Sequence, residues 1–147
     1  MSDFKNQSAG PWVVFSDGAA KGNPGPSGAG WLIRDPQGQV RAENGKFLGH
    51  GTNNEAEYQA LTAALEEAWS LGAKAVAVHL DSELVVRQLN GQYRVKSDRL
   101  RKFYQQAQDL LRRFQDYAII HIPRERNREA DRLANEAIKD HYRTQDN

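Results

Sequence analysis

The chain has 147 residues, so a single domain is the default expectation, and a chain of this length can bury a substantial core. Its 20 Lys and Arg residues nearly balance 19 Asp and Glu residues, and the net charge of +1 excludes a uniformly basic surface. Hydrophobic residues make up 39% of the chain and charged residues 27%, as in soluble globular proteins. The absence of cysteine excludes disulfides and cysteine-ligated metals.

Both ends of the chain are polar, and we expect a single domain over 1–147 whose folded core spans about 11–140. The N-terminal residues have no apolar segment of the kind found in secretory signals. No stretch approaches the ~18 apolar residues that a membrane-spanning helix needs. The sequence therefore predicts a soluble cytoplasmic protein with no membrane partner.

The first third of the chain predicts three strands joined by short connections. We place these strands at 12–15, 28–34 and 40–48. Asp17-Gly18 ends the first strand, and a loop dense in Gly and Pro follows at 21–26. A turn at 35–38 separates the other two strands. Short connections of this kind favour antiparallel pairing.

Helical spacing of apolar residues begins after Thr52. Thr52 and Glu55 fit a capping box, in which each side chain bonds the other's free backbone N–H, and Gly72 is a suitable stop. Asn127 is placed to cap the last helix. We predict further strands at 75–80 and 117–122, and helices at 82–90, 98–115 and from 127 onward. The order implies an α/β fold: a five-stranded mixed sheet, three antiparallel strands followed by two parallel ones, flanked by helices.

Four acids occupy similar places in this pattern. Asp17 and Asp81 each follow a predicted strand, while Glu57 and Asp131 lie in the first turn of a predicted helix. Ligands of open α/β sheets collect at the carboxyl ends of strands, so these side chains would meet at one edge. Four carboxylates there would repel one another unless a cation lay between them, and magnesium or manganese prefers oxygen ligands. Taken singly, each acid also fits ordinary turn or helix-start chemistry.

Four segments resemble, in chain order, the motifs of type 1 ribonuclease H. They lie at 17–26, 52–57, 81–82 and 127–134. The resemblance runs from about residue 12 to about residue 139. Its specific parts are the Gly-Asn-Pro-Gly loop and the Thr-Asn-Asn-x-x-Glu segment. It implies a ribonuclease H-like fold and an endonuclease that hydrolyses the RNA strand of RNA–DNA hybrids, leaving 5′-phosphate and 3′-hydroxyl ends.

The resemblance also implies a cofactor. Carried over to this sequence, it makes Asp17, Glu57, Asp81 and Asp131 the ligands of two magnesium ions, with manganese as the substitute. Two such ions can activate a water and stabilise the departing oxygen of an in-line displacement. By analogy alone, Asp17 would bridge both ions. The family expectation for oligomeric state is a monomer.

Recognition of a hybrid requires contact with ribose 2′-hydroxyls in a minor groove. Gly22, Asn23 and Asn53 resemble hybrid-contacting positions of the family, and Asn54 is a similar candidate. Helix capping is the alternative role for the last two. Tyr93, Arg94 and Lys96 begin a basic cluster that continues through Arg99, Arg101 and Lys102. We expect this cluster to contact the DNA strand, although a solvated helix face would have the same composition.

The sequence departs from the family pattern in three places. Residues 91–98 lack the basic, Trp-rich protrusion of some members, so we expect weaker hybrid binding, and we expect no N-terminal hybrid-binding domain. The loop at 123–126 has no histidine, and His121 is predicted inside a strand without a catalytic task. Arg124 is our candidate replacement, because a guanidinium can hold a phosphate although it cannot shuttle a proton. Arg126 is the weaker alternative.

Two other functions stay open at this point. The first is another nuclease or strand-transfer enzyme on the same fold, because such enzymes share a carboxylate and metal core. The second is a non-catalytic hybrid-binding module, against which the four acids argue, since concentrated negative charge would oppose phosphate binding. Substrate preference separates these alternatives directly.

Overall fold

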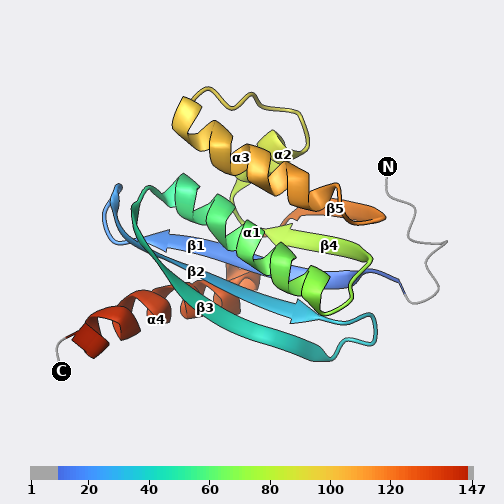
Figure 1. Cartoon of the computed structure of the whole chain (residues 1–147), viewed down its shortest axis with the longest axis horizontal. Helices are drawn as coiled ribbons and strands as arrows, with labels where there is room; N and C mark the ends of the chain where they lie inside the picture. The colour runs from blue at the N-terminus through green and yellow to red at the C-terminus, as the bar shows by residue number, and fades with distance from the viewer. Residues whose placement is uncertain (1–9, 146–147) are drawn as a thin grey trace.

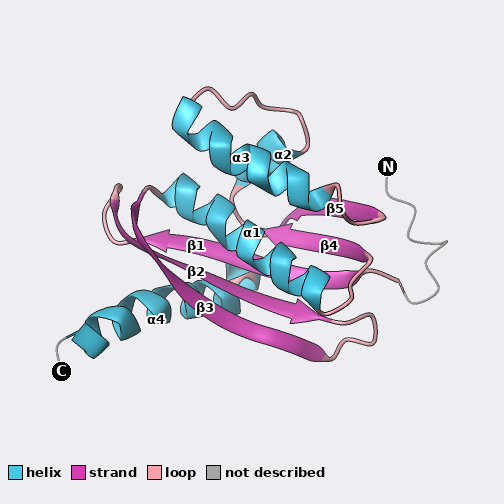
Figure 2. Ribbon diagram, viewed as in Figure 1, coloured by secondary structure: helices cyan, strands magenta, loops and turns pink. Residues whose placement is uncertain are grey.

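The computed structural model describes residues 10–145, in which one sheet carries helices on both faces (Figures 1 and 2). In chain order the elements are β1 (Trp12–Ala20), β2 (Gly25–Arg34), β3 (Val40–Gly51), α1 (Asn53–Ser70), β4 (Ala75–Leu80), α2 (Glu83–Leu89), α3 (Asp98–Leu111), β5 (Asp116–His121), a 3₁₀ helix (Arg124–Arg126) and α4 (Arg128–Gln145). Every helix in this part of the chain is too short or too polar to cross a membrane.

The strands lie in the order β3-β2-β1-β4-β5. β2 pairs antiparallel with β1 and β3, whereas β4 pairs parallel with β1 and β5. The predicted α/β class and five-stranded mixed sheet are confirmed. In Figure 1, α1, α2 and α3 lie on one face of the sheet and α4 lies on the other.

Several predicted boundaries were wrong. β2 begins at Gly25 rather than at 28, and β3 ends at Gly51 rather than at 48, because their antiparallel pairing extends to Gly25 opposite Gly51. β1 does not end before Asp17, because its antiparallel pairing with β2 continues to Ala20, so Asp17 lies inside a strand. α3 ends at Leu111 rather than at 115, because the chain turns there and Gln115 N donates to Lys74 O at 2.8 Å.

The capping box at the start of α1 is confirmed. Thr52 Oγ1 accepts a hydrogen bond from Glu55 N at 3.1 Å, and Glu55 Oε1 accepts one from Thr52 N at 2.8 Å. The helix closes at Leu71, followed by Gly72 with a φ of +99°, a conformation that suits glycine. These signals fix where α1 begins, and hence where Glu57 stands.

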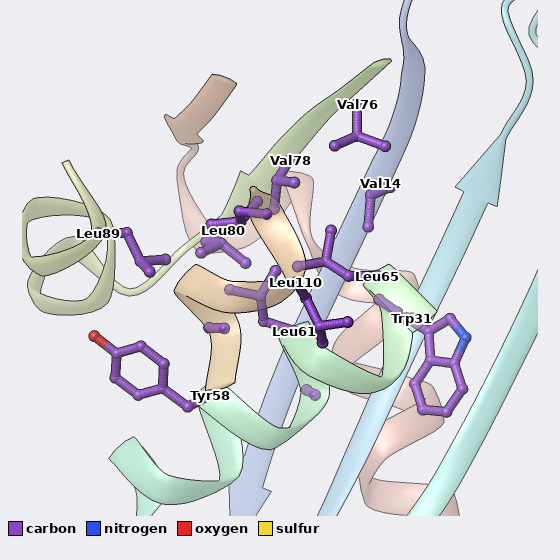
Figure 3. Close-up of a cluster of buried hydrophobic side chains, with 14 of the residues drawn as sticks. Val14, Trp31, Tyr58, Leu61, Leu65, Val76, Val78, Leu80, Leu89 and Leu110 are labelled. Atoms are coloured by element: carbon purple, nitrogen blue, oxygen red, sulfur yellow. The ribbon is translucent and has the colours of Figure 1, made fainter. Parts of the chain in front are cut away.

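The main core lies between the sheet and the helices α1 to α3 (Figure 3). Val14, Val76 and Val78 alternate inward from neighbouring strands and meet Leu61 and Leu65 of α1, all fully buried. Burying each such side chain contributes about 1.5–3 kcal/mol. This packing fixes α1 against the strands that carry Asp17 and precede Asp81.

α4 packs on the opposite face against backbone. Glycines of β2 and β3 lie beneath it, and a side chain at Gly30 would collide with the carbonyl oxygen of Ala130. Further along α4, the ring of His141 stacks on Phe47 of β3 at 3.7 Å. The close approach at Gly30 sets the distance between the sheet and the first turns of α4, which carry Asp131.

Gly30→Ala tests this approach. We expect a loss of about 3 kcal/mol in the free energy of unfolding measured in urea, at the upper end of overpacking costs, because the obstacle is helix backbone. Gly38→Ala is the control: the space around Gly38 is open and its φ is +86°, so only the left-handed conformation costs energy, about 1–2 kcal/mol. Equal losses in both variants would contradict a tight contact between α4 and the sheet.

Candidate active site

Strand register brings the first two acids together. The parallel pairing of β1 with β4 runs as far as Phe15 opposite His79. Asp17 and Asp81 each lie two residues after this last pair. Because side chains alternate between the two faces of a sheet, Asp17 and Asp81 point to the same face as Phe15 and His79. Beyond Phe15, β1 pairs only with β2, so the edge of β1 that faces β4 is unpaired beside Asp17 and can be approached by other groups.

Glu57 reaches the same place from α1, whose first turns lie over the carboxyl end of β1 (Figure 1). A side chain at Gly18 would collide with the backbone of Ala56, so the absence of one lets the helix come this close. Gly18 N donates to Glu57 Oε1 at 3.2 Å. One carboxylate oxygen from each of Asp17, Glu57 and Asp81 lies within 4.8 Å of the others.

Asp131 completes the predicted set from the first turn of α4. It lies outside the tightest group of oxygens, but it lines the same hollow of about 510 Å³. Asn135, one turn further along α4, donates from Nδ2 to Asp131 O at 2.9 Å and to Asp131 Oδ1 at 3.2 Å. The four acids predicted from the sequence therefore face one hollow.

The electrostatics of this hollow oppose four free negative charges. Asp17 and Glu57 are only 4% and 8% exposed. Burial raises the pKa of the Asp17 carboxyl far above its ordinary value, and the hydrogen bond with Glu57 and the charges of Glu57 and Asp81 add to the shift. Burial also raises the pKa of Glu57, to about 7, and the charge of Asp81 acts in the same direction. A positive ion between the carboxylates would reverse these shifts.

The donor set fits a hard divalent cation. The three clustered ligands are all carboxylates, and Glu57 Oε2 is buried without a hydrogen-bond partner in the part of the chain that the structure describes. Magnesium and manganese prefer such oxygen ligands. A buried carboxylate oxygen without a donor is the group that a metal ion would satisfy.

Asn127 does not cap α4 with its side chain, contrary to the prediction. Its Nδ2 donates instead to Ser16 O and to Asp81 Oδ2, both at 2.9 Å, and its Oδ1 has no hydrogen-bond partner among the described residues. Sequence analysis missed this contact because Ser16 lies 111 residues away. Asn135 was also missed, although its spacing of four residues from Asp131 on a helix was a usable signal.

Of the three predicted asparagines, Asn53 lies beside the acids and contacts Asn23. Asn53 Oδ1 accepts from Ala20 N at 3.1 Å, so this side chain holds the end of β1 rather than capping α1. Asn53 N donates to Asn23 Oδ1 at 3.0 Å. Asn53 lines the acidic hollow, whereas Asn23 and Asn54 line a neighbouring one of about 310 Å³. Gly22 lies in the intervening loop with a φ of +98°.

The predicted basic residues stand apart from the acids. Tyr93, Arg94 and Lys96 line a third hollow of about 530 Å³, which shares Ser97 and Leu100 with the second. Tyr93 is 49% exposed, and the Arg87 guanidinium lies 5.2 Å from its ring centre. The three hollows therefore follow one another from the acids past the start of α1 to the segment before α3.

Two other members of the basic cluster already have partners within the chain. Arg99 forms an ion pair with buried Glu55 of the capping box. Arg101 pairs with Asp98 at 2.9 Å and donates to Val95 O at 3.1 Å. Arg99 thus attaches the start of α3 to the start of α1, whereas Arg101 bonds only within α3 and the segment before it. Arg94 and Lys96 are the cations that line the third hollow.

Arg124 lines the acidic hollow together with the four acids. It is exposed and lies in the 3₁₀ helix before α4. Arg126, two residues later, lines a separate small hollow with Phe15 and Leu32. His121 is an exposed residue at the end of β5, as predicted for a strand histidine.

A mixed sheet with buried carboxylates at its centre defines the ribonuclease H-like class of α/β protein. A family model described as reverse transcriptase-like matches residues 15–137. The chain is 44% identical over 127 residues to ribonuclease HI of Halobacterium salinarum, a match that covers 86% of this chain and 64% of that protein. It is 45% identical to a bifunctional protein of Mycobacterium tuberculosis, of which it spans 35%. The chain thus spans less than two thirds of either curated relative.

Solved structures agree with the sequence matches. The crystal structure of RNase H1 from Halobacterium salinarum matches with a TM-score of 0.86 and 44% identity, over 89% of this chain and 99% of that one. LC11-RNase H1, solved in complex with an RNA/DNA hybrid, matches with a TM-score of 0.84 and 40% identity, over 89% and 99%. The chain belongs to the ribonuclease HI family.

Glu57→Gln tests the electrostatics of the acidic hollow. The raised pKa of Glu57, about 7 against 4.5, means that the folded chain binds this proton more tightly than the unfolded chain. Stability in chelator should therefore fall as pH rises from about 4.5 to about 7. Glutamine carries no charge, so we expect the variant to be more stable than the wild type between pH ~5 and ~8. The free energy of unfolding should be higher by roughly 1–3 kcal/mol, which corresponds to about 3–10 °C in melting temperature.

The same melting experiment with saturating magnesium is the control. The ion binds the folded state, so it should stabilise the wild type more than Glu57→Gln and close the difference at high pH. A difference between the two proteins that does not change with pH in chelator would contradict an ionisable Glu57 held among like charges.

Proposed function

We propose that this chain hydrolyses the RNA strand of RNA–DNA hybrids at internal positions, leaving 5′-phosphate and 3′-hydroxyl ends. The observation that carries the proposal is the group of carboxylate oxygens of Asp17, Glu57 and Asp81 within 4.8 Å of one another, in a chain of the ribonuclease HI family. The relative solved with an RNA/DNA hybrid supports the choice of substrate. In this proposal the chain acts as a monomer in the cytoplasm.

In this proposal Asp17, Glu57, Asp81 and Asp131 hold two magnesium ions, which manganese can replace. Asp17 is the most central of the four, because it lies in β1 between the strand that precedes Asp81 and the helix that carries Glu57. The chemistry that two divalent ions supply at such a site is activation of a water and stabilisation of the departing 3′ oxygen. The carboxylates must therefore be ionised and held at fixed positions before the substrate arrives.

In this proposal the three hollows bind different parts of the hybrid. Asn53 lines the acidic hollow, and Asn23 and Asn54 line the neighbouring one. Together with Gly22 of the loop between β1 and β2, these residues would read the minor groove, where 2′-hydroxyls distinguish ribose from deoxyribose. Tyr93, Arg94 and Lys96 lie furthest from the acids and would bind the DNA strand through stacking and phosphate contacts. The DNA strand would then bind away from the acids, and the RNA phosphate would lie among them.

The proposal is tested on one end-labelled duplex sequence, made as RNA–DNA, RNA–RNA and DNA–DNA. Each duplex is incubated with magnesium, manganese or chelator. We expect internal cuts in the RNA of the hybrid, only with metal, and none in Asp81→Asn, which keeps the size of the side chain but not its charge. Preferred cleavage of DNA would instead indicate another nuclease of this fold, and hybrid binding without cleavage a non-catalytic module.

Arg124 is proposed to hold a phosphate of the cleaved strand at the mouth of the acidic hollow. A hydrogen bond to a charged group contributes about 1.5–3 kcal/mol, so we expect Arg124→Ala to lower kcat roughly 10-fold or more and to change KM little. Single-turnover and steady-state cleavage of the hybrid give the two constants.

Arg126→Ala is the matched control for this prediction. Arg126 has the same chemistry and lies in the same 3₁₀ helix, but it lines a different hollow. We expect it to leave kcat within about twofold. An equal kcat for Arg124→Ala and the wild type would exclude the proposed role of Arg124.

A further inference from the structure

Asn127 is a polar side chain buried deep beside the acids. It is 1% exposed and ranks among the largest fully buried side chains of the chain. Asparagine at this depth needs hydrogen-bond partners, because an unpaired buried amide is costly. Its two amide hydrogens have partners, whereas its Oδ1 has none among the described residues.

The partners of Asn127 lie on three different elements. Nδ2 donates to Ser16 O, the residue before Asp17 in β1, and to Oδ2 of Asp81, the residue after β4, both at 2.9 Å. The backbone oxygen of Asn127 accepts from Asp131 N at 3.1 Å in the first turn of α4. One residue thus connects the positions of three of the four acids.

The direction of this amide is fixed by its surroundings. If the amide were turned over, Oδ1 would face the Ser16 carbonyl and the Asp81 carboxylate, both of which only accept hydrogen bonds. The observed orientation is therefore the favoured one, although it leaves Oδ1 without a hydrogen-bond donor. The unpaired oxygen indicates that this residue is placed for its two donors and not for its own satisfaction.

We propose that Asn127 is a positioning residue for metal binding. Its amide occupies Oδ2 of Asp81 and so turns the other carboxylate oxygen toward the cation, while its backbone holds Asp131 at a fixed distance from both strands. The inference rests on the proposed function, because it assumes that the acids hold divalent ions. Neither helix capping nor core packing explains why a buried amide at Asn127 donates to these two acceptors.

The test measures manganese binding by electron paramagnetic resonance, without substrate, in the wild type, Asn127→Ala and Asn127→Leu. Leucine has a similar size and shape but no donor, so it separates the hydrogen bonds from the volume of the side chain. Loss of a residue that orients a metal ligand typically weakens metal binding about 10–100-fold, and we expect at least a 10-fold loss in both variants. The hybrid KM at saturating metal should change little, while kcat falls.

Asn44→Ala is the matched control. Asn44 also donates from Nδ2 to a carboxylate, Glu67 Oε1 at 2.6 Å, but on the β3 side of α1, away from the acids. We expect its manganese affinity to equal that of the wild type. Wild-type affinity in folded Asn127→Leu would overturn the proposal.

A measurement on the wild type covers the case in which the Asn127 variants do not fold. In nitrogen-15 spectra, the side-chain amide signals of Asn127 should shift when magnesium is added, and those of Asn44 should not. Unshifted Asn127 signals at saturating magnesium would overturn the proposal. A wild type that binds manganese more tightly than the Asn127 variants but cuts no hybrid would support this inference while contradicting the proposed function.

Discussion

Repulsion among buried carboxylates is the constraint on which this structure depends. Three acids place oxygens within 4.8 Å of one another, and two of them are nearly inaccessible to water. Like charges at this spacing raise one another's pKa and oppose folding. The chain tolerates the arrangement because a core on one face of the sheet and a tightly packed helix on the other hold the acids in place. In the proposed function, a divalent cation offsets this repulsion and is bound by the same carboxylates.

The fold delivers each acid to this point by a different physical means. Parallel register places Asp17 beside Asp81, and the missing side chain at Gly18 admits α1 with Glu57. Gly30 sets the approach of α4, which carries Asp131. These contacts involve backbone, which cannot move aside as a flexible side chain can. The separation of the acids is therefore set by strand and helix packing, so a cation would meet a site formed in advance.

Local signals in the sequence were sufficient to predict most of the fold and to predict that the four acids meet at one edge of the sheet. The capping box at Thr52 and the strand ending before Asp81 could be predicted because they depend on neighbouring residues. The end of β1 could not, because it depends on pairing with β2. The side chain of Asn127 and the ion pair of Arg99 with Glu55 were also missed, since their partners lie 111 and 44 residues away. The spacing of residues along the chain does not predict such long-range contacts.

The most direct test of the central claim is a crystal structure of Asp131→Asn with an RNA–DNA hybrid and manganese, in which anomalous scattering locates the ions. We expect the loss of the Asp131 charge to slow cleavage and so preserve the substrate, while the tight group formed by Asp17, Glu57 and Asp81 stays unaltered. We expect separate manganese peaks between Asp17, Glu57 and Asp81, with a phosphate of the RNA strand against them and the DNA strand near Tyr93. A hybrid bound with no metal among these carboxylates, or with the DNA strand over them, would contradict the proposed function.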